Sequence, residues 1–119
     1  METKEIAKRL ADYCRKADWD GAHTELYAEN AKSVEPYASD GFEKETTGLK
    51  AIREKGKKFD SMVEQVHKIE VSEPLVAGNS IAFTLGMDIT MKGKGRMNNP
   101  ELCVYQVKDG KIVAEEFFV

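Results

Sequence analysis

Residues 81–91, IAFTLGMDITM, decide the fold of this 119-residue chain. Apolar and short side chains alternate through the segment, as in a strand with one buried face. The predicted inward side chains are Ile81, Phe83, Leu85, Met87, Ile89 and Met91. A flat strand of about 12 residues would run about 40 Å, longer than a domain of this size is wide, so the sheet must bend strongly.

Strand patterns separated by turn sequences lie on both sides of this segment and predict an antiparallel meander. The expected strands cover residues 65–73, 80–92, 96–108 and 111–119, with turns at 77–79, 93–95 and 109–110. Gly86 and the run 98–100, Asn-Asn-Pro, are the expected positions of a bend, because glycine permits unusual backbone angles and proline cannot join a regular ladder.

The first half of the chain has helical periodicity. Residues 3–17 carry apolar side chains three and four positions apart, which indicates an amphipathic helix. Asp18 is the expected cap of a second helix that runs through Asn30, and a short strand should follow at 32–35. The pair Asp40 and Gly41 predicts the turn of a small hairpin over residues 34–42.

A third helix is expected after a cap at Thr47, because apolar residues from Leu49 to Met62 share one face. The lysines and arginines at 53, 55, 57 and 58 are predicted to form a solvated face of this helix. A bent antiparallel sheet wrapped around three N-terminal helices makes an α+β cone, and its wide end should leave an internal pocket.

The composition limits the class of protein. Hydrophobic residues make up 41% and charged residues 33%, which is ordinary for a single globular domain over residues 1–119. The net charge of -3 offers no basic surface for nucleic acid. The start METKEIAKRL is charged where a signal peptide is apolar, and no apolar run is long enough for a bilayer, so we expect a cytoplasmic protein that does not bind membranes.

Two cysteines, Cys14 and Cys103, lie far apart in the sequence and have no neighbouring metal ligands. Two reduced, buried thiols are therefore expected rather than a disulfide or a zinc site. The sequence predicts no metal and no cofactor.

Glu35 stands directly before Pro36, at the end of the segment DWDGAHTELYAENAKSVEP (18–36). A residue before proline favours extended geometry, so Glu35 should end a strand with its side chain held out from the sheet. In an apolar pocket this carboxylate would suit the role of a general base. The alternative is an exposed carboxylate at the end of a strand.

Two side chains on the later strands are further candidates. His67 shares strand parity with Ile69 and should face the core, either as a titrating group or as a buried hydrogen-bonding histidine. Tyr105 shares parity with Glu101 and Cys103, and its phenol could donate to a substrate oxygen or simply anchor the core.

The order of elements, with the segments DWDGAHTELYAENAKSVEP (18–36), GLKAIREKGKKF (48–59) and VYQVKDGKIVAEEFF (104–118), resembles the nuclear-transport-factor-2-like superfamily. It is most similar to the SnoaL-like and ketosteroid-isomerase-like branches, over nearly the whole chain. The resemblance implies a cystatin-like α+β roll. It also implies that Glu35 is the general base, because ketosteroid isomerases carry an acid directly before the matching proline.

Two other positions of those isomerases do not match. Their phenol on the first helix falls on Leu10, and their carboxylic acid donor falls near Cys103. Steroid isomerisation itself is therefore not expected. The resemblance also favours Glu115 over Glu116 as an inward residue of the last strand, together with Val113 and Phe117. A buried Glu115 would be functional or paired with His67 or Arg96.

The catalytic candidates are Glu35, His67, Glu115 and Tyr105. The predicted pocket wall consists of Tyr13, Trp19, Phe59, Phe83, Leu85, Met87 and Cys103. For Tyr13 and Trp19, packing between helices is the alternative explanation.

These residues predict a SnoaL-like domain that binds an apolar, carbonyl-bearing small molecule. If it turns this molecule over, the reaction should be an isomerisation or cyclisation with Glu35 as base. The alternatives are a ligand-binding domain without turnover and a protein-interaction domain. We also expect a homodimer through the convex face of the sheet, where Leu102, Val104 and Phe118 should form an apolar patch.

Overall fold

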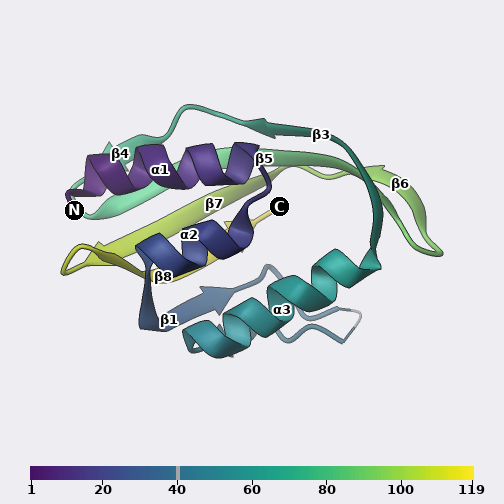
Figure 1. Ribbon diagram of the computed structural model, residues 1–119, viewed down its shortest axis with the longest axis horizontal. Coiled ribbons are helices and arrows are strands. Elements are labelled where there is room, and N and C mark those ends of the chain that lie inside the picture. The colour runs from purple at the N-terminus through teal and green to yellow at the C-terminus, as the bar shows by residue number, and fades with distance from the viewer. Residues whose placement is uncertain (40) are drawn as a thin grey trace.

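The computed structural model describes residues 1–39 and 41–119, so that Asp40, half of the expected turn, lies outside the described residues. Within this part of the chain, three helices lie on the concave side of one eight-stranded sheet (Figure 1). The helices are α1 (Thr3–Arg15), α2 (Trp19–Leu26) and α3 (Leu49–Met62). The strands are β1 (Tyr27–Val34), β2 (Glu45–Thr47), β3 (Val63–Val71), β4 (Leu75–Ala77), β5 (Ser80–Met91), β6 (Gly95–Asn98), β7 (Glu101–Lys108) and β8 (Lys111–Phe118). The expected α+β architecture is confirmed.

The sheet is mixed. Its strand order is β2-β1-β8-β7-β5-β3, and β4 and β6 also pair with β5. The meander is antiparallel, but β1 pairs with β8 in parallel, so the expectation of a wholly antiparallel sheet is wrong here. No turn joins β1 to β8, and nothing local in the sequence indicates their relative direction. Their register sets Ser33 beside Glu115.

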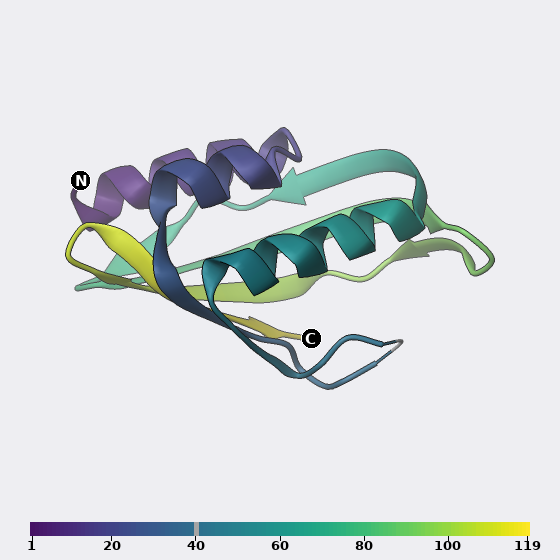
Figure 2. The ribbon, with the colours of Figure 1, turned by 60° about the horizontal axis from the view of Figure 1, so that its bottom comes forward.

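Strand β5 faces the core as its alternation predicts. Its buried side chains are Ile81, Phe83, Leu85, Ile89 and Met91, each at most 6% exposed. Strands β6 and β7 pair with the second and first halves of β5, and the single strand expected over 96–108 is interrupted at Asn99 and Pro100. Figure 2 shows the long strands passing beneath and around the helices, so that the interior lies between α3 and the sheet.

Two predicted helix boundaries are wrong. Helix α2 ends at Leu26 instead of continuing through Asn30, because Tyr27 pairs with Ile112 of β8 and buries its ring as the first residue of β1. The N-cap of α3 is Gly48, with φ 95°, a conformation that glycine adopts without strain. Thr47, the expected cap, belongs to β2 and pairs with Lys32.

The core forms where α1 and α2 pack against β5, β7 and β8. Its fully buried side chains include Ile6, Leu10, Leu26, Ile52, Ile81, Cys103 and Ile112. Burial of this apolar surface is the main stabilising contribution to the fold. No helix in the described residues has the length and apolar character needed to cross a membrane.

Candidate functional site

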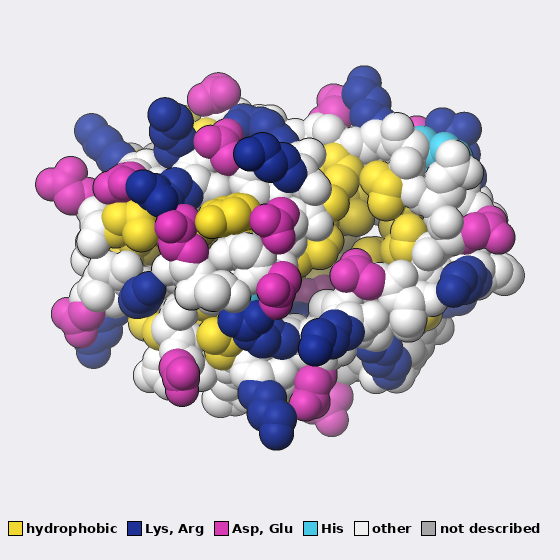
Figure 3. Space-filling view, viewed as in Figure 1, with side chains coloured by type: hydrophobic (Ala, Val, Ile, Leu, Met, Phe, Trp, Pro, Cys, Tyr) yellow, Lys and Arg dark blue, Asp and Glu magenta, His cyan; other side chains and the backbone are white. Residues whose placement is uncertain are grey.

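Polar side chains from the first and second halves of the chain meet on the concave side of the sheet. We call this group the interior cluster; it consists of Tyr27, Ser33, Glu35, Lys55, Glu101 and Glu115. Four secondary-structure elements and the turn after β1 contribute to it. Figure 3 shows that the face carrying the helices is hollowed beside α3, with hydrophobic side chains around the opening.

Glu115 is the deepest member of the cluster and is 6% exposed. The hydroxyl of Tyr27 donates to Oε1 of Glu115, and Ser33 Oγ donates to Oε2 at 2.7 Å. Burial raises the pKa of Glu115, and these two hydrogen bonds oppose that rise only in part. The carboxyl group is therefore held in place by two donors although it lies away from water.

The expectation that Glu115 faces inward is confirmed, but its predicted partners are wrong. Arg96 pairs with Asp88, with nitrogen–oxygen distances of 2.8 and 2.9 Å, and His67 bonds to Thr90. Strand parity could not identify the real partners, because Tyr27 and Ser33 reach Glu115 through the parallel pairing of β1 with β8.

The last strand also departs from simple alternation. Both Ile112 and Glu115 are buried, since a bulge in the pairing of β7 with β8 leaves Val113 without a partner. An extra residue in one strand reverses the parity on either side of it. Glu115 and Phe117 therefore face inward as predicted. Val113, the third residue predicted to face inward, lies at the bulge, and Ile112 is the buried residue before it.

Glu35 follows the end of β1, and its backbone N–H donates to the carbonyl of Lys44 at 2.6 Å. Its side chain is 28% exposed, and Oε2 lies 3.5 Å from Nζ of Lys55. This is the strand-end position expected of a residue before proline. The carboxylate is neither fully solvated nor fully buried.

Lys55 corrects the prediction that all the basic residues of α3 form a solvated face. Its side chain is only 17% exposed, and Nζ donates to Ser33 Oγ at 2.7 Å. The ammonium group lies 5.9 Å from the centre of the Phe117 ring, within the range of a cation–π contact. A signal was present in the sequence: Lys55 lies three residues after Ile52 and four before Phe59, on the apolar stripe of the helix.

Glu101, at the start of β7, was not among the predicted site residues. Burial, followed by the charge of Glu35, raises the pKa of Glu101 to about 7. Cys103 Sγ lies 3.8 Å from Glu101 Oε1 on the same side of the strand. The shared parity with Cys103 and Tyr105 could have identified this carboxyl group.

His67 does not belong to the cluster. The side chain is exposed, and Nε2 lies 2.7 Å from Oγ1 of Thr90. The predicted inward orientation is wrong because the register of β3 with β5 shifts between Val66 and Lys68. His67 is the extra residue of this bulge, and counting parity back from Ile69 therefore fails.

Tyr105 is buried, as expected for a side chain that anchors the core. Its ring stacks on Phe83 at 5.4 Å between centroids and meets Phe117 edge-on at 6.5 Å. Burial raises the pKa of the Tyr105 phenol well above its ordinary value. These contacts describe a core anchor, and a role in catalysis stays a prediction.

The predicted wall residues occupy different depths. Phe83, Leu85 and Cys103 are buried in the core, and Met87 and Trp19 pack against it. Tyr13 packs there too, but its hydroxyl donates to Glu25 at 3.0 Å on the helical surface. Phe59 on α3 is half-buried.

Two hollows on the surface lie away from the interior cluster. One, of about 540 Å³, is bordered by the N-terminal residues 1–4 and by the turns at 78–79 and 109–110. The other, of about 410 Å³, lies over β3 and β5 and is bordered by Thr84, Gly86 and Asp88. Neither is lined by the carboxyl groups of the cluster. Among the described residues, no group of three or more His, Cys, Asp or Glu side chains is placed to hold a metal.

Comparison with known proteins identifies the type of domain. The model of the SnoaL-like domain family matches residues 1–119. A candidate SnoaL-like polyketide cyclase from Mesorhizobium loti is 32% identical, with a TM-score of 0.90 over 100% of both chains. A comparison with curated proteins gives no significant match.

More distant structures share the fold. A protein of unknown function with a cystatin-like fold from Xanthomonas campestris is 18% identical, with a TM-score of 0.83 over 99% of this chain and 90% of its own. A ketosteroid-isomerase-like protein from Catenulispora acidiphila, solved with trimethylamine, is 18% identical, with a TM-score of 0.75 over 97% of this chain and 85% of its own. At these identities the likeness concerns the fold alone.

Proposed function

This chain belongs to the SnoaL-like family, and from that premise we propose that it is an acid–base enzyme that moves a proton next to the carbonyl group of an apolar small molecule. The reaction class is isomerisation or cyclisation. Glu35 acts as the general base, and Glu101 is the acid that returns a proton.

The observation that carries the proposal is the position of Glu35, whose partly exposed carboxylate lies 3.5 Å from Lys55 at the edge of the interior cluster. The second carboxyl group of the proposal is Glu101, in the same cluster. A carboxyl group with a pKa of about 7 can hold or release a proton at neutral pH, which is the condition for efficient proton transfer. Glu35 is 28% exposed, so its carboxylate is accessible to a ligand. Two carboxyl groups in different surroundings can take the two roles of base and acid.

The step balances within these groups. A Glu35 carboxylate oxygen takes the proton from the carbon next to the carbonyl, and the electron pair of the broken C–H bond forms the C=C bond of an enolate. The carbonyl π electrons move to the oxygen. In an isomerisation, Glu101 delivers its proton to another carbon of the conjugated system, while an electron pair on the enolate oxygen forms the C=O bond again. The proton on Glu35 is then returned to Glu101 through water.

A second function has its own supporting observation. By the resemblance to ketosteroid isomerases, Leu10 stands where those enzymes carry a phenol, and Cys103 lies near the position of their carboxylic acid donor. Both residues are buried in the core. A domain without those donors could bind the same apolar ligand and release it unchanged. An experiment must therefore distinguish an enzyme that turns the ligand over from a domain that only binds it.

The test uses β-tetralone, a bicyclic ketone with acidic hydrogens beside its carbonyl, in deuterated water. Proton NMR follows replacement of those hydrogens by deuterium. The wild-type protein should accelerate the exchange, and Glu35→Gln should reduce the acceleration on the order of 100-fold or more, as removal of a general base does. Glu29→Gln, an exposed glutamate of β1, is the matched control and should exchange at the wild-type rate.

Saturable binding of β-tetralone without accelerated exchange would support the binding domain and reject the enzyme. Acceleration that survives in Glu35→Gln would remove Glu35 from the mechanism.

A further inference from the structure

Lys55 interacts with more groups than a lysine that only forms an ion pair with one carboxylate would need. Its ammonium group contacts Ser33 Oγ at 2.7 Å and Glu35 Oε2 at 3.5 Å. Its positive charge also acts on Glu101 and Glu115, where it favours the ionised form of each carboxyl group. One cation on α3 thus faces three carboxyl groups that come from other elements.

The hydrogen bonds of the cluster leave Lys55 with capacity for a ligand. An ammonium group has three N–H donors. Ser33 Oγ accepts one of them and donates its own hydroxyl hydrogen bond to Glu115. Glu35, at 3.5 Å, is an ion-pair partner beyond good hydrogen-bonding distance. The side chain retains 17% exposure, so the ammonium group is not fully enclosed by the protein.

We propose that Lys55 is a catalytic residue that binds the ligand oxygen on which negative charge develops. The proposal rests on the proton transfer by Glu35 described above and adds the missing oxyanion donor. When Glu35 takes the proton, the enolate oxygen becomes negative, and a neighbouring ammonium group stabilises it where bulk water is largely excluded. Lys55 thereby supplies the stabilisation that Leu10 and Cys103 cannot.

The same geometry defines the class of ligand. A compound whose oxygen ionises readily, such as an enolisable dicarbonyl or a phenol-like ring, places its negative oxygen on Lys55 and its apolar part toward Phe117. A ligand of equal shape without such an oxygen gains only the apolar contact. Selectivity for ionisable oxygen is therefore the property that distinguishes this role of Lys55 from simple neutralisation of the carboxyl groups.

The probe is 4-nitrophenol, whose phenolate absorbs visible light, measured in buffer below its own pKa. The wild-type protein should bind it and increase the ionised fraction of the bound phenol. Lys55→Met should weaken phenolate binding on the order of 10-fold or more and restore the ionisation of the free compound, because a hydrogen bond to a charged group is lost. Lys55→Arg, which keeps the charge, should retain part of the effect.

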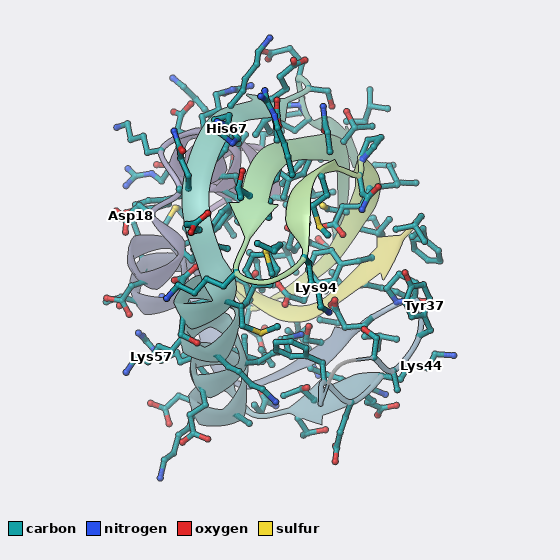
Figure 4. All side chains as sticks on the ribbon, turned by 90° about the vertical axis from the view of Figure 1, so that its right-hand side faces the viewer. Asp18, Tyr37, Lys44, Lys57, His67 and Lys94 are labelled. Atoms are coloured by element: carbon teal, nitrogen blue, oxygen red, sulfur yellow. The ribbon has the colours of Figure 1, made fainter. Side chains whose placement is uncertain are left out.

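Two controls keep the test specific. Lys57→Met removes an equal charge from the outer side of α3, where Figure 4 shows Lys57, and should leave the ionisation unchanged. 4-Nitrotoluene has a similar shape but no ionisable oxygen, and its affinity should be the same for wild type and Lys55→Met. Circular dichroism with a urea titration checks that each variant folds.

Absence of an ionisation shift in the wild-type protein, or an equal shift in Lys55→Met, would overturn the role of Lys55. That result would leave Glu35-dependent exchange of β-tetralone intact. The opposite outcome is also informative. If the protein does not accelerate the exchange of β-tetralone but shifts the ionisation of 4-nitrophenol through Lys55, the proposed reaction is rejected and the oxyanion-binding role of Lys55 stands.

Discussion

The hydroxyl of Tyr27 on β1 donates a hydrogen bond to the carboxyl group of Glu115 on β8, and the two side chains are 7% and 6% exposed. Because β1 and β8 pair in parallel, this bond joins the first strand of the chain to the last one inside the sheet. It also fixes the innermost carboxyl group of the interior cluster.

Tyr27→Phe should lower the free energy of unfolding by about 1–3 kcal/mol, since Glu115 loses one of its two donors while it stays buried. Urea denaturation at neutral pH measures this change. Tyr37→Phe, at a side chain that is 62% exposed, should have almost no effect. Equal stability of the Tyr27 variant and the wild type would mean that Glu115 finds another donor or water.

Glu101→Gln should make the protein less sensitive to pH. The folded pKa of Glu101 is raised from 4.5 to about 7, so the folded state binds this proton more tightly than the unfolded state does. The contribution of this proton to the free energy of unfolding is fully present below pH 4.5 and is lost as the pH rises through 7. At about pH 8 the variant should be more stable than the wild type by on the order of 3 kcal/mol.

Urea titrations at about pH 4 and about pH 8 provide this comparison. Glu29→Gln, which changes an exposed carboxylate, should follow the wild type at both values. If Glu101→Gln destabilises the protein equally at both, the amide disrupts packing and the assigned proton affinity is wrong.

Both thiols should react slowly in the folded protein. Burial raises the pKa of Cys14 to about 12 and also raises the pKa of Cys103. Since the thiolate is the reactive form, Cys14 should react on the order of 1,000-fold more slowly than an exposed cysteine. A colorimetric disulfide reagent measures the rate, and both thiols should react at once in urea. Rapid reaction of either thiol without urea would contradict this burial.

We propose that the protein forms a two-fold symmetric dimer through the convex face of the sheet. Leu102 and Phe118 are cross-strand partners, 41% and 45% exposed, and create an apolar patch there with the half-buried Val104. Sedimentation equilibrium at micromolar concentration should give twice the chain mass of 13.4 kDa.

Val104→Glu should dissociate the dimer, because a charge would be buried in the interface. Tyr37→Glu, in the loop after β1, should leave it intact. A wild-type monomer refutes the dimer, and a dimer that persists in Val104→Glu places the contact on another surface.

The amino-acid sequence determined the features that depend on neighbouring residues. The alternation of residues 81–91 predicted the inner face of β5, the helical spacing of residues 3–17 predicted α1, and Pro36 placed Glu35 at the end of a strand. Each depends on backbone geometry within a few residues, and a periodic pattern records that geometry directly.

Only the tertiary structure decided which side chains meet. The bulge at His67 turned that residue outward, because one extra residue in a strand reverses parity without leaving a mark in the sequence. The parallel pairing of β1 with β8 gave Glu115 its partners, and the packing of α3 over β1 brought Lys55 to Ser33 and Glu35. These contacts join segments far apart in the chain, where the free energy of burying and pairing polar groups, and no local preference, selects the arrangement.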